Sequence, residues 1–172
     1  MKKFTLILAL VGFIAHTNAQ ELKWFTIEEA VELNKTAPKK IMVDVYTDWC
    51  GWCKVMDKNT FKQPDIAKYL NENYYPVKFN AEQKEDVNIL GTTFKFVQQG
   101  SRGSHQLAAA LGATGYPYVV FLDEDMNVIT SLPGYTKAQQ FDKVINYING
   151  EHYKNSDFET WSATYTSPVA AD

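Results

Sequence analysis

Several classes of protein are excluded by what this chain has little of. Its 172 residues include only two cysteines, which are too few for a disulfide scaffold in a secreted domain of this size. A structural zinc site usually needs four protein ligands, and no further cysteine exists to complete such a set. The basic residues form no cluster and the net charge is −3, so nucleic acid is not expected as a partner. The sequence also has no internal repeat and no low-complexity tract.

The first 19 residues have the layout of a secretory signal peptide. Lys2 and Lys3 form a short basic start, residues 4–15 are an apolar run, and residues 17–19 resemble a small-residue cleavage site. The alternative is a membrane anchor, but the apolar run is short for a span that needs roughly 20 residues. No cysteine follows the run, which argues against a lipid anchor. We therefore expect residues 1–19 to direct export to the periplasm or another extracytoplasmic compartment.

The rest of the chain alternates between helical and extended patterns. Thr26 and Glu29 form a capping box that predicts a helix running to about Lys35. The run over 41–46 is short and apolar, as in a strand covered on both faces, except for Asp44 in its middle. The next elements expected are a helix that begins at Cys50 and runs to about Lys58, a helix beginning at Pro64, a strand at 74–80 and a short helix near 85–90. After them we expect a helix capped by Ser104 and running to Leu111, strands at 118–122 and 128–132, and a helix from a second capping box at Thr136 and Gln139 to Gly150.

Together these elements predict an α/β fold. Strands linked through helices are expected to pair in parallel with right-handed crossovers, whereas the tight turn at 123–127 makes the last pair antiparallel. The result is a mixed central β-sheet with helices on both faces. One domain is expected over residues 20–150, with a less predictable insert at about 81–103 and a polar tail over 151–172.

The two cysteines, Cys50 and Cys53, lie where the strand ending at Tyr46 meets the next helix. A thiol at a helix N-terminus faces unpaired N–H groups and the positive end of the helix dipole. We therefore expect the pKa of Cys50 to be lowered and its sulfur to be an exposed nucleophile. Cys53 lies one turn deeper on the same face, within disulfide reach. Because a structural disulfide here would close only a very short loop, we interpret the pair as a reversible redox switch. Cu(I) held by the two thiolates remains an open alternative.

Four separated features follow one another in residues 21–150. They are Trp49-Cys50-Gly51-Trp52-Cys53-Lys54, Asp44 on the preceding strand, Lys78 on the next strand, and Gly115-Tyr116-Pro117 with Gly134 after it. Together they resemble the thioredoxin superfamily, and the last feature is similar to that family's cis-proline loop. A single Cys-x-x-Cys is a weak signal because it also occurs in zinc sites, whereas all four features in order are a strong one. Within the superfamily the chain is similar to exported thioredoxin-like proteins, a group that includes the C-terminal domain of the bacterial disulfide reductase DsbD.

Two departures from thioredoxin bear on substrate and direction. The dipeptide between the cysteines is Gly51-Trp52 rather than Gly-Pro, and the segment between Asn80 and Pro117 is longer. A histidine in that dipeptide, as in strong oxidants and isomerases, hydrogen-bonds the thiolate and favours the reduced form. Trp52 carries no charge, so we expect a reductase rather than an oxidase or isomerase.

The resemblance implies four catalytic residues. Cys50 attacks a substrate disulfide, and Cys53 resolves the mixed disulfide that results. Asp44, its pKa raised by burial, is the candidate base for Cys53, and Lys78 moderates the charge of that carboxylate. The plainer alternatives are that Asp44 is a strand-end acid held by hydrogen bonds and that Lys78 is a surface lysine.

The resemblance also implies a binding site for an extended substrate peptide. A cis Tyr116–Pro117 bond would bring backbone groups of that loop to the peptide, and Trp49 and Trp52 would contact its apolar side chains. Alternatively, Pro117 is an ordinary trans turn proline and Trp52 only packs.

Beyond the site itself, the expected partners are protein thiols and disulfides and a membrane thiol-electron donor. We expect no cofactor and no metal, and a monomeric chain. The insert at 81–103 is expected beside the Tyr116-Pro117 loop. His105 and His152, which are distant from Cys53 in sequence, are expected at the surface.

Overall fold

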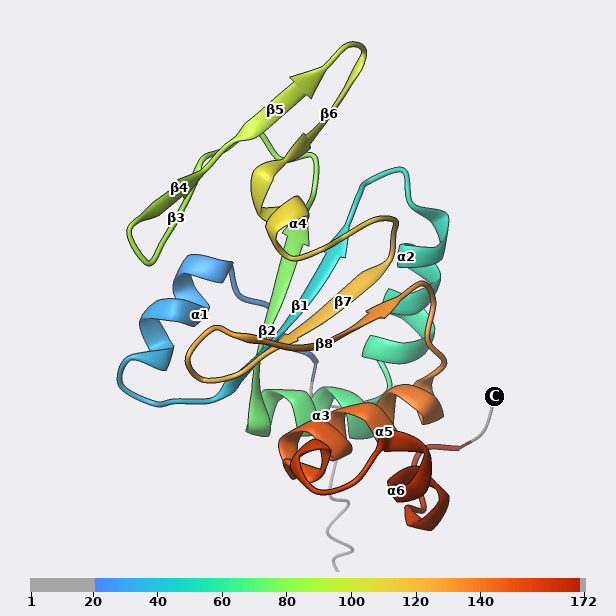
Figure 1. The fold of residues 1–172 in the computed structure, drawn as a ribbon. Helices are drawn as coiled ribbons and strands as arrows, with labels where there is room; N and C mark the ends of the chain where they lie inside the picture. Colours follow the sequence, from blue (N-terminus) through green and yellow to red (C-terminus); the bar gives the residue numbers. More distant parts are fainter. Residues whose placement is uncertain (1–20, 171–172) are drawn as a thin grey trace, which may run out of the picture.

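The computed structural model describes residues 21–170, and the predicted signal peptide lies outside them. A mixed four-stranded sheet occupies the centre of the molecule, in the order β2-β1-β7-β8 (Figure 1). β1 pairs in parallel with β2, and β7 is antiparallel to both β1 and β8. The predicted α/β fold with a mixed sheet is thus confirmed. The four strands are β1 (Lys40–Tyr46), β2 (Tyr74–Asn80), β7 (Tyr118–Leu122) and β8 (Val128–Pro133).

The parallel pairing predicted for all helix-linked strands is wrong for β7. The backbone N–H of His105 donates to the carbonyl of Ala81, directly after β2. The chain therefore returns from the insert at the end of the sheet where β2 finishes, and it enters β7 from that end. A strand that starts there must run opposite to β2 and β1.

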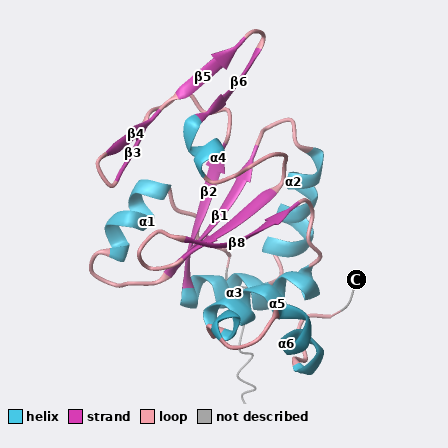
Figure 2. Ribbon diagram, viewed as in Figure 1, coloured by secondary structure: helices cyan, strands magenta, loops and turns pink. Residues whose placement is uncertain are grey.

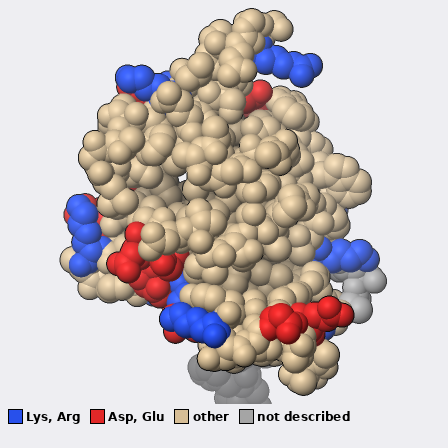
Figure 3. Space-filling model, viewed as in Figure 1, with Lys and Arg blue, Asp and Glu red and all other residues tan. Residues whose placement is uncertain are grey.

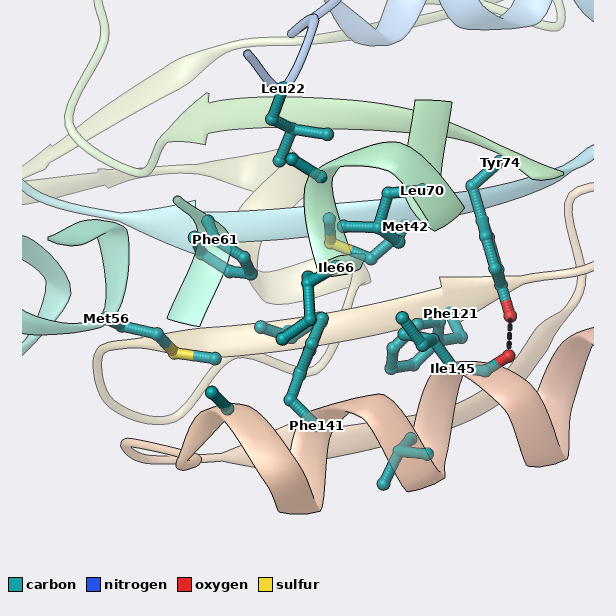
Figure 4. Packing of buried hydrophobic residues seen from close by; sticks show 14 of the residues in the cluster. Leu22, Met42, Met56, Phe61, Ile66, Leu70, Tyr74, Phe121, Phe141 and Ile145 are labelled. Carbon is teal, nitrogen blue, oxygen red and sulfur yellow. Dashed lines mark hydrogen bonds between the residues drawn. The ribbon is translucent and has the colours of Figure 1, made fainter. Parts of the chain in front are cut away.

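Helices cover both faces of the sheet (Figure 2). Alternate residues of β1 supply the two cores, because successive side chains of a strand point to opposite faces. Met42 packs beneath α3 (Pro64–Asn73) and α5 (Ala138–Asn149), whereas Val43 and Val45 pack beneath α1 (Ile27–Asn34) and α4 (Gln106–Ala110). In the first core the Tyr74 hydroxyl donates to the carbonyl of Ile145 at 2.7 Å, which fastens α5 to β2 (Figure 4).

Of the two predicted capping boxes, only the first is confirmed. Before α1, the Thr26 hydroxyl accepts the N–H of Glu29 and the Glu29 carboxylate accepts the N–H of Thr26. The second box is wrong, since α5 begins after Lys137 without a side-chain cap. Gln139 instead donates through its side-chain amide to the carbonyl of Val169. The Gln139 side chain is therefore bonded to the tail and does not complete the capping box.

The insert at 81–103 consists of two hairpins, so the short helix predicted near 85–90 is wrong. Leu90 and Gly91 join β3 to β4 with φ values of +50° and +77°, the left-handed pair that a tight hairpin turn requires. In the second hairpin, a Cβ on Gly103 would lie 2.2 Å from the ring of Phe96, so only glycine fits there. The strands are β3 (Val87–Ile89), β4 (Thr92–Phe94), β5 (Phe96–Gln99) and β6 (Arg102–His105).

His105 is fully buried, so its predicted surface position is wrong. Its Nδ1 accepts the N–H of Leu107 and thereby caps α4, in place of the predicted Ser104 cap. Its Nε2 lies 3.1 Å from the carbonyl of Glu85, and its ring meets Phe79 edge-on at 5.3 Å. One side chain thus joins the insert, α4 and the core.

The tail packs against α5 (Figure 1). Val169 is buried in the core beneath α5, and the Tyr165 hydroxyl donates to Asp142 at 3.1 Å. Within residues 21–170, no helix combines the length and the apolar character needed to cross a membrane. The tail contains a short 3-10 turn (His152–Lys154) and α6 (Phe158–Thr164).

Candidate active site

Cys50 and Cys53 form a disulfide at the junction of β1 and α2 (Gly51–Met56), with their Cα atoms 5.3 Å apart. Cys50 is the N-cap residue of α2, and its Sγ accepts the backbone N–H of Cys53 at 3.1 Å. The N–H groups of the first helical turn have no partner inside the helix. One of them therefore points at the sulfur on which a thiolate would carry its charge.

The exposed Cys50 sulfur that the sequence predicted is not seen in this oxidised structure. Cys50 is only 4% exposed and Cys53 only 3%. In this state Sγ of Cys50 is bonded to Sγ of Cys53 and accepts the N–H of Cys53. Trp49 and Trp52, at 67% and 62% exposure, are the large groups that solvent meets beside the disulfide.

The strand that leads to the disulfide, β1, carries the buried acid. Asp44 is 1% exposed, and its Oδ2 lies 2.8 Å from Nζ of Lys78, its register partner on β2. The other oxygen, Oδ1, has no hydrogen-bond partner within residues 21–170. Burial raises the pKa of the Asp44 carboxyl to about 6, against the opposing effect of Lys78. Asp44 can therefore hold or release a proton near neutral pH, as an acid or base must.

Lys78 has a second carboxylate partner, Asp57, which the sequence analysis missed. Asp57 begins a π-helical turn (Asp57–Phe61) that continues α2. Burial alone would lower the pKa of Lys78, but the ion pairs with Asp44 and Asp57 outweigh it and leave that pKa raised. The sequence could have identified Asp57 as a site residue, because a residue four positions after Cys53 lies on the same helical face.

Lys78 is also enclosed by aromatic rings. Its ammonium lies 4.8 Å from the ring centre of Trp24 and 5.0 Å from that of Tyr46, distances at which the ring faces attract a cation. A surface lysine would have no such surroundings, so the alternative interpretation of Lys78 is not supported.

The Tyr116–Pro117 peptide bond is cis, as predicted. The carbonyl of Pro117 accepts the N–H of Gly134 at 2.8 Å, which joins this loop to the one after β8. The two loops and Trp52 line a cleft of about 300 Å³, together with Tyr135, a residue that sequence reasoning missed. Nothing in the sequence marked Tyr135, because only the fold brings it to Trp52.

Trp49 also packs against Tyr116. Its ring centre lies 6.0 Å from that of Tyr116, and its indole N–H donates to the Glu82 carboxylate at 3.1 Å. Glu82 is the second residue of the insert, which therefore contacts Trp49 at that end. The β3–β4 hairpin packs elsewhere, on α1, where the N–H of Asn88 donates to Glu28. The predicted place beside the Tyr116-Pro117 loop is thus supported for Glu82, through Trp49, and not for the β3–β4 hairpin.

The structure joins Cys50 to Cys53 and pairs Asp44 with Lys78 on adjacent strands. It also places Trp49 against Tyr116, and Trp52 beside Tyr116 and Pro117 in one cleft. Within residues 21–170, no three His, Cys, Asp or Glu side chains converge as they would around a metal ion.

Comparisons with known proteins agree with this geometry. A family model described as a thioredoxin-like domain matches residues 27–149. An uncharacterized protein of Caenorhabditis elegans is 31% identical over 118 residues, which are 68% of this chain and 14% of that protein. The thiol:disulfide interchange protein DsbD of Vibrio vulnificus is 28% identical over 134 residues, 76% of this chain and 19% of DsbD. This chain thus spans less than a fifth of the length of these two relatives.

A solved thioredoxin-fold protein from Helicobacter pylori superposes with a TM-score of 0.57 at 19% identity, covering 73% of this chain and 79% of the other. At that identity the likeness concerns the fold alone.

Proposed function

The chain belongs to the thioredoxin-like domain family, and on that basis we propose that it is an extracytoplasmic thiol–disulfide oxidoreductase that reduces disulfides in client proteins. The observation that carries the proposal is the Cys50–Cys53 disulfide at the start of α2, directly after the strand that holds the buried Asp44. The name of the DsbD relatives, thiol:disulfide interchange protein, supports the same chemistry.

The reaction begins from the reduced dithiol. The Cys50 thiolate attacks one sulfur of the client disulfide, forms a Cys50–client bond and expels the other client sulfur as a thiolate. The Cys53 thiolate then attacks Sγ of Cys50, restores the Cys50–Cys53 disulfide and expels the second client thiolate. Two electrons pass to the client, and its two sulfurs take up protons. A dithiol donor must then reduce the Cys50–Cys53 bond, and we propose a membrane protein as that donor.

Asp44 acts in the second step. Cys53 is buried, so water cannot readily take its proton. An ionised Asp44, with Oδ1 unpaired, would accept that proton, directly or through a water molecule. Lys78 holds the other oxygen and keeps the acid partly ionised near neutral pH.

The reducing direction rests on what stabilises the Cys50 sulfur. Within residues 21–170, its hydrogen bond comes from the backbone N–H of Cys53, and Trp52 adds no charge beside it. A thiolate with less stabilisation gives a less oxidising couple. Determination of the reduction potential against glutathione and dithiothreitol tests this. A potential towards that of thioredoxin, roughly −270 mV, is expected for a reductase. A potential close to that of a strong oxidant, about −120 mV, would assign oxidation instead.

The decisive experiment is trapping with Cys53→Ala. Without Cys53 the mixed disulfide cannot be resolved, so clients should accumulate on Cys50 and be identified by mass spectrometry after release with dithiothreitol. The double variant Cys50→Ala/Cys53→Ala is the control and should capture none. An insulin-reduction assay and a copper determination on the wild-type protein run beside it. Stoichiometric copper with no disulfide turnover would overturn the proposal.

Export is tested separately. Residues 1–19 are fused to a reporter enzyme that is active only outside the cytoplasm, with Leu8→Arg as a control that interrupts the apolar run. Reporter activity that requires Leu8 supports an extracytoplasmic protein, and an inactive wild-type fusion contradicts it.

A further inference from the structure

We propose that a cavity at the far end of the sheet from the disulfide is a docking site for a segment of a partner protein. The segment inserts one large apolar side chain into the cavity. A basic residue close to it in the segment's sequence lies on the turn between β7 and β8. This inference does not depend on the proposed reduction of client disulfides, because neither Cys50 nor Cys53 lines the cavity.

The cavity lies between the insert and the body of the domain. Side chains from α1, α4, the β3–β4 hairpin and the β7–β8 pair line it, and its volume is about 230 Å³. Leu122, the last residue of β7, is part of the lining and is the register partner of Ile41, near the start of β1. The disulfide follows the other end of β1. A segment docked in the cavity would therefore leave the disulfide uncovered.

The lining is apolar. Among the described residues around the cavity, Thr92 has the single polar side chain and none is charged. An engineered apolar cavity of about 150 Å³ is large enough to bind benzene. The larger cavity of this chain can therefore take one aromatic or large aliphatic side chain, such as that of Phe or Leu.

Two apolar side chains at the edge of the cavity are open to solvent. Leu90, at the tip of the β3–β4 hairpin, is 69% exposed, and Val128, the first residue of β8, is 54% exposed. A small molecule inside the cavity would leave the outer parts of these side chains in water. A peptide segment would cover them and bury further apolar surface. The exposure therefore favours a protein partner over a free small ligand.

Leu90 and Met126 line the cavity from two different turns, and both have a left-handed backbone. Their φ values are +50° and +69°. This conformation is uncommon for bulky residues, and glycine or asparagine adopts it more readily. Residues held in such conformations cluster at functional sites, ligand clamps among them. Two apolar side chains thus lie at the cavity where the turn geometry alone would favour other residues.

An acidic hollow of about 240 Å³ adjoins the cavity. The two share Leu90 and Met126 in their linings. Glu124 and Asp125, on the turn between β7 and β8, also line the hollow. Figure 3 shows acidic side chains gathered over this turn, beside an uncharged area of the same face. A segment that fills the cavity would therefore pass a negatively charged surface directly beside it.

The charge of the hollow is only partly compensated. Lys35, the cation in its lining, is paired with Glu32, and Glu124 is paired with the buried Lys40. Asp125 is exposed and forms no ion pair within residues 21–170. A lysine or arginine of the partner segment would supply the missing positive charge, whereas an acidic residue would be repelled.

The test selects a displayed library of short random peptides on the immobilised, oxidised protein. The library contains no cysteine, so the disulfide cannot capture its members covalently. We expect the enriched peptides to carry Phe, Trp, Leu or Met with Lys or Arg close by. The best of them is synthesised, and its Kd is measured by calorimetry. A selection that enriches no peptide would overturn the proposal.

The cavity is tested with Ala110→Phe, which places a ring in it from an exposed position on α4. We expect this variant to bind the peptide about tenfold more weakly or worse. Ala109→Phe is the matched control, since Ala109 is also exposed on α4 but does not line the cavity, and its Kd should stay within about twofold. Val128→Ser replaces Ala110→Phe if that variant does not fold. Equal affinity of Ala110→Phe and the wild type would overturn the proposal.

The charge is tested with Asp125→Lys. This variant should bind the peptide about threefold more weakly, and a peptide with Glu in place of its basic residue should bind Asp125→Lys better than the wild type. Asp65→Lys, which makes the same change in the first turn of α3, should leave both affinities unchanged. Equal weakening by Asp125→Lys and Asp65→Lys would contradict a contact at the β7–β8 turn.

Two further measurements separate the possible outcomes. Indole that binds the cavity as tightly as the peptide would assign the cavity to a small apolar ligand and overturn the docking of a partner segment. Insulin reduction by Ala110→Phe should proceed at the wild-type rate. A wild-type protein that binds the peptide in the cavity but reduces no insulin would overturn the proposed function and leave the docking site standing.

Discussion

Nζ of Lys78 lies 2.8 Å from Oδ2 of Asp44, and the two residues are register partners on the parallel strands β2 and β1. The pKa of Asp44 stays raised, at about 6, despite this ion pair. The ion pair therefore does not fully compensate the loss of water around the carboxylate. The ionised acid is therefore retained at a cost in stability. The proposed role of Asp44 in deprotonating Cys53 would explain why the chain keeps an acid that costs stability.

Replacing Asp44 should stabilise the oxidised protein at neutral pH. The folded-state pKa, about 6, lies above the reference value of 3.8, so the native state binds more protons than the unfolded state between these values. The contribution of Asp44 to the free energy of unfolding therefore falls as pH rises from 3.8 to about 6. At about 1.4 kcal/mol for each pKa unit, Asp44→Asn should gain about 3 kcal/mol at pH 7 and almost nothing near pH 4.

Urea unfolding of the oxidised wild type and Asp44→Asn at pH 4 to 8 measures this difference. The same variant should resolve mixed disulfides more slowly than the wild type above pH 6. A stability gain of equal size at every pH would show that ionisation of Asp44 is not its source.

Removing Asp57 should shift the pH dependence of the resolving step to lower pH. The negative charge of Asp57 raises the pKa of Asp44, and Asp57 also shares Lys78 with it. In Asp57→Asn, Lys78 forms an ion pair with Asp44 alone, so the pKa of Asp44 should fall below about 6. Single-turnover measurement of the Cys53 step against pH detects the shift. Asp65→Asn, an exposed acid in the first turn of α3, is the matched control, and an equal shift in both variants would assign it to net charge.

Loss of His105 should loosen the insert. His105→Ala removes the contact with the Glu85 carbonyl, the α4 cap and the packing against Phe79, for an expected cost of about 2–4 kcal/mol. His105→Asn keeps a side-chain acceptor for the cap and should cost less. Denaturant unfolding gives the free energies, and hydrogen exchange should rise first in residues 81–103. Exchange that stays unchanged there would show that the insert is held by other contacts.

The tail should contribute to the stability of the domain. Val169→Ala deletes two methyl groups from a side chain that is 4% exposed in the core beneath α5, and we expect a loss of about 2 kcal/mol in the free energy of unfolding. Val97→Ala, on an exposed part of β5, is the control and should change stability little. Equal stability of Val169→Ala and the wild type would mean that the tail only rests on the surface.

The sequence by itself determined the features that depend on near neighbours. The Thr26–Glu29 capping box, the apolar strands and the placement of Cys50 and Cys53 at a helix start follow from backbone hydrogen bonding and periodicity within a few residues. Asp44 and Lys78 were also found in sequence, and the parallel register of β1 and β2 brought them together.

Only the tertiary structure decided the remaining features, because they arise from packing between elements. The backbone bond from His105 to Ala81 returns the chain to the end of β2, from which β7 runs antiparallel, and the buried ring of His105 contacts Glu85 of the insert. The fold buried the Cys50 sulfur, and the π-helical turn brought the Thr60 hydroxyl to the carbonyl of Thr136. No local pattern encodes these contacts, since each depends on which distant side chain fills the space beside it.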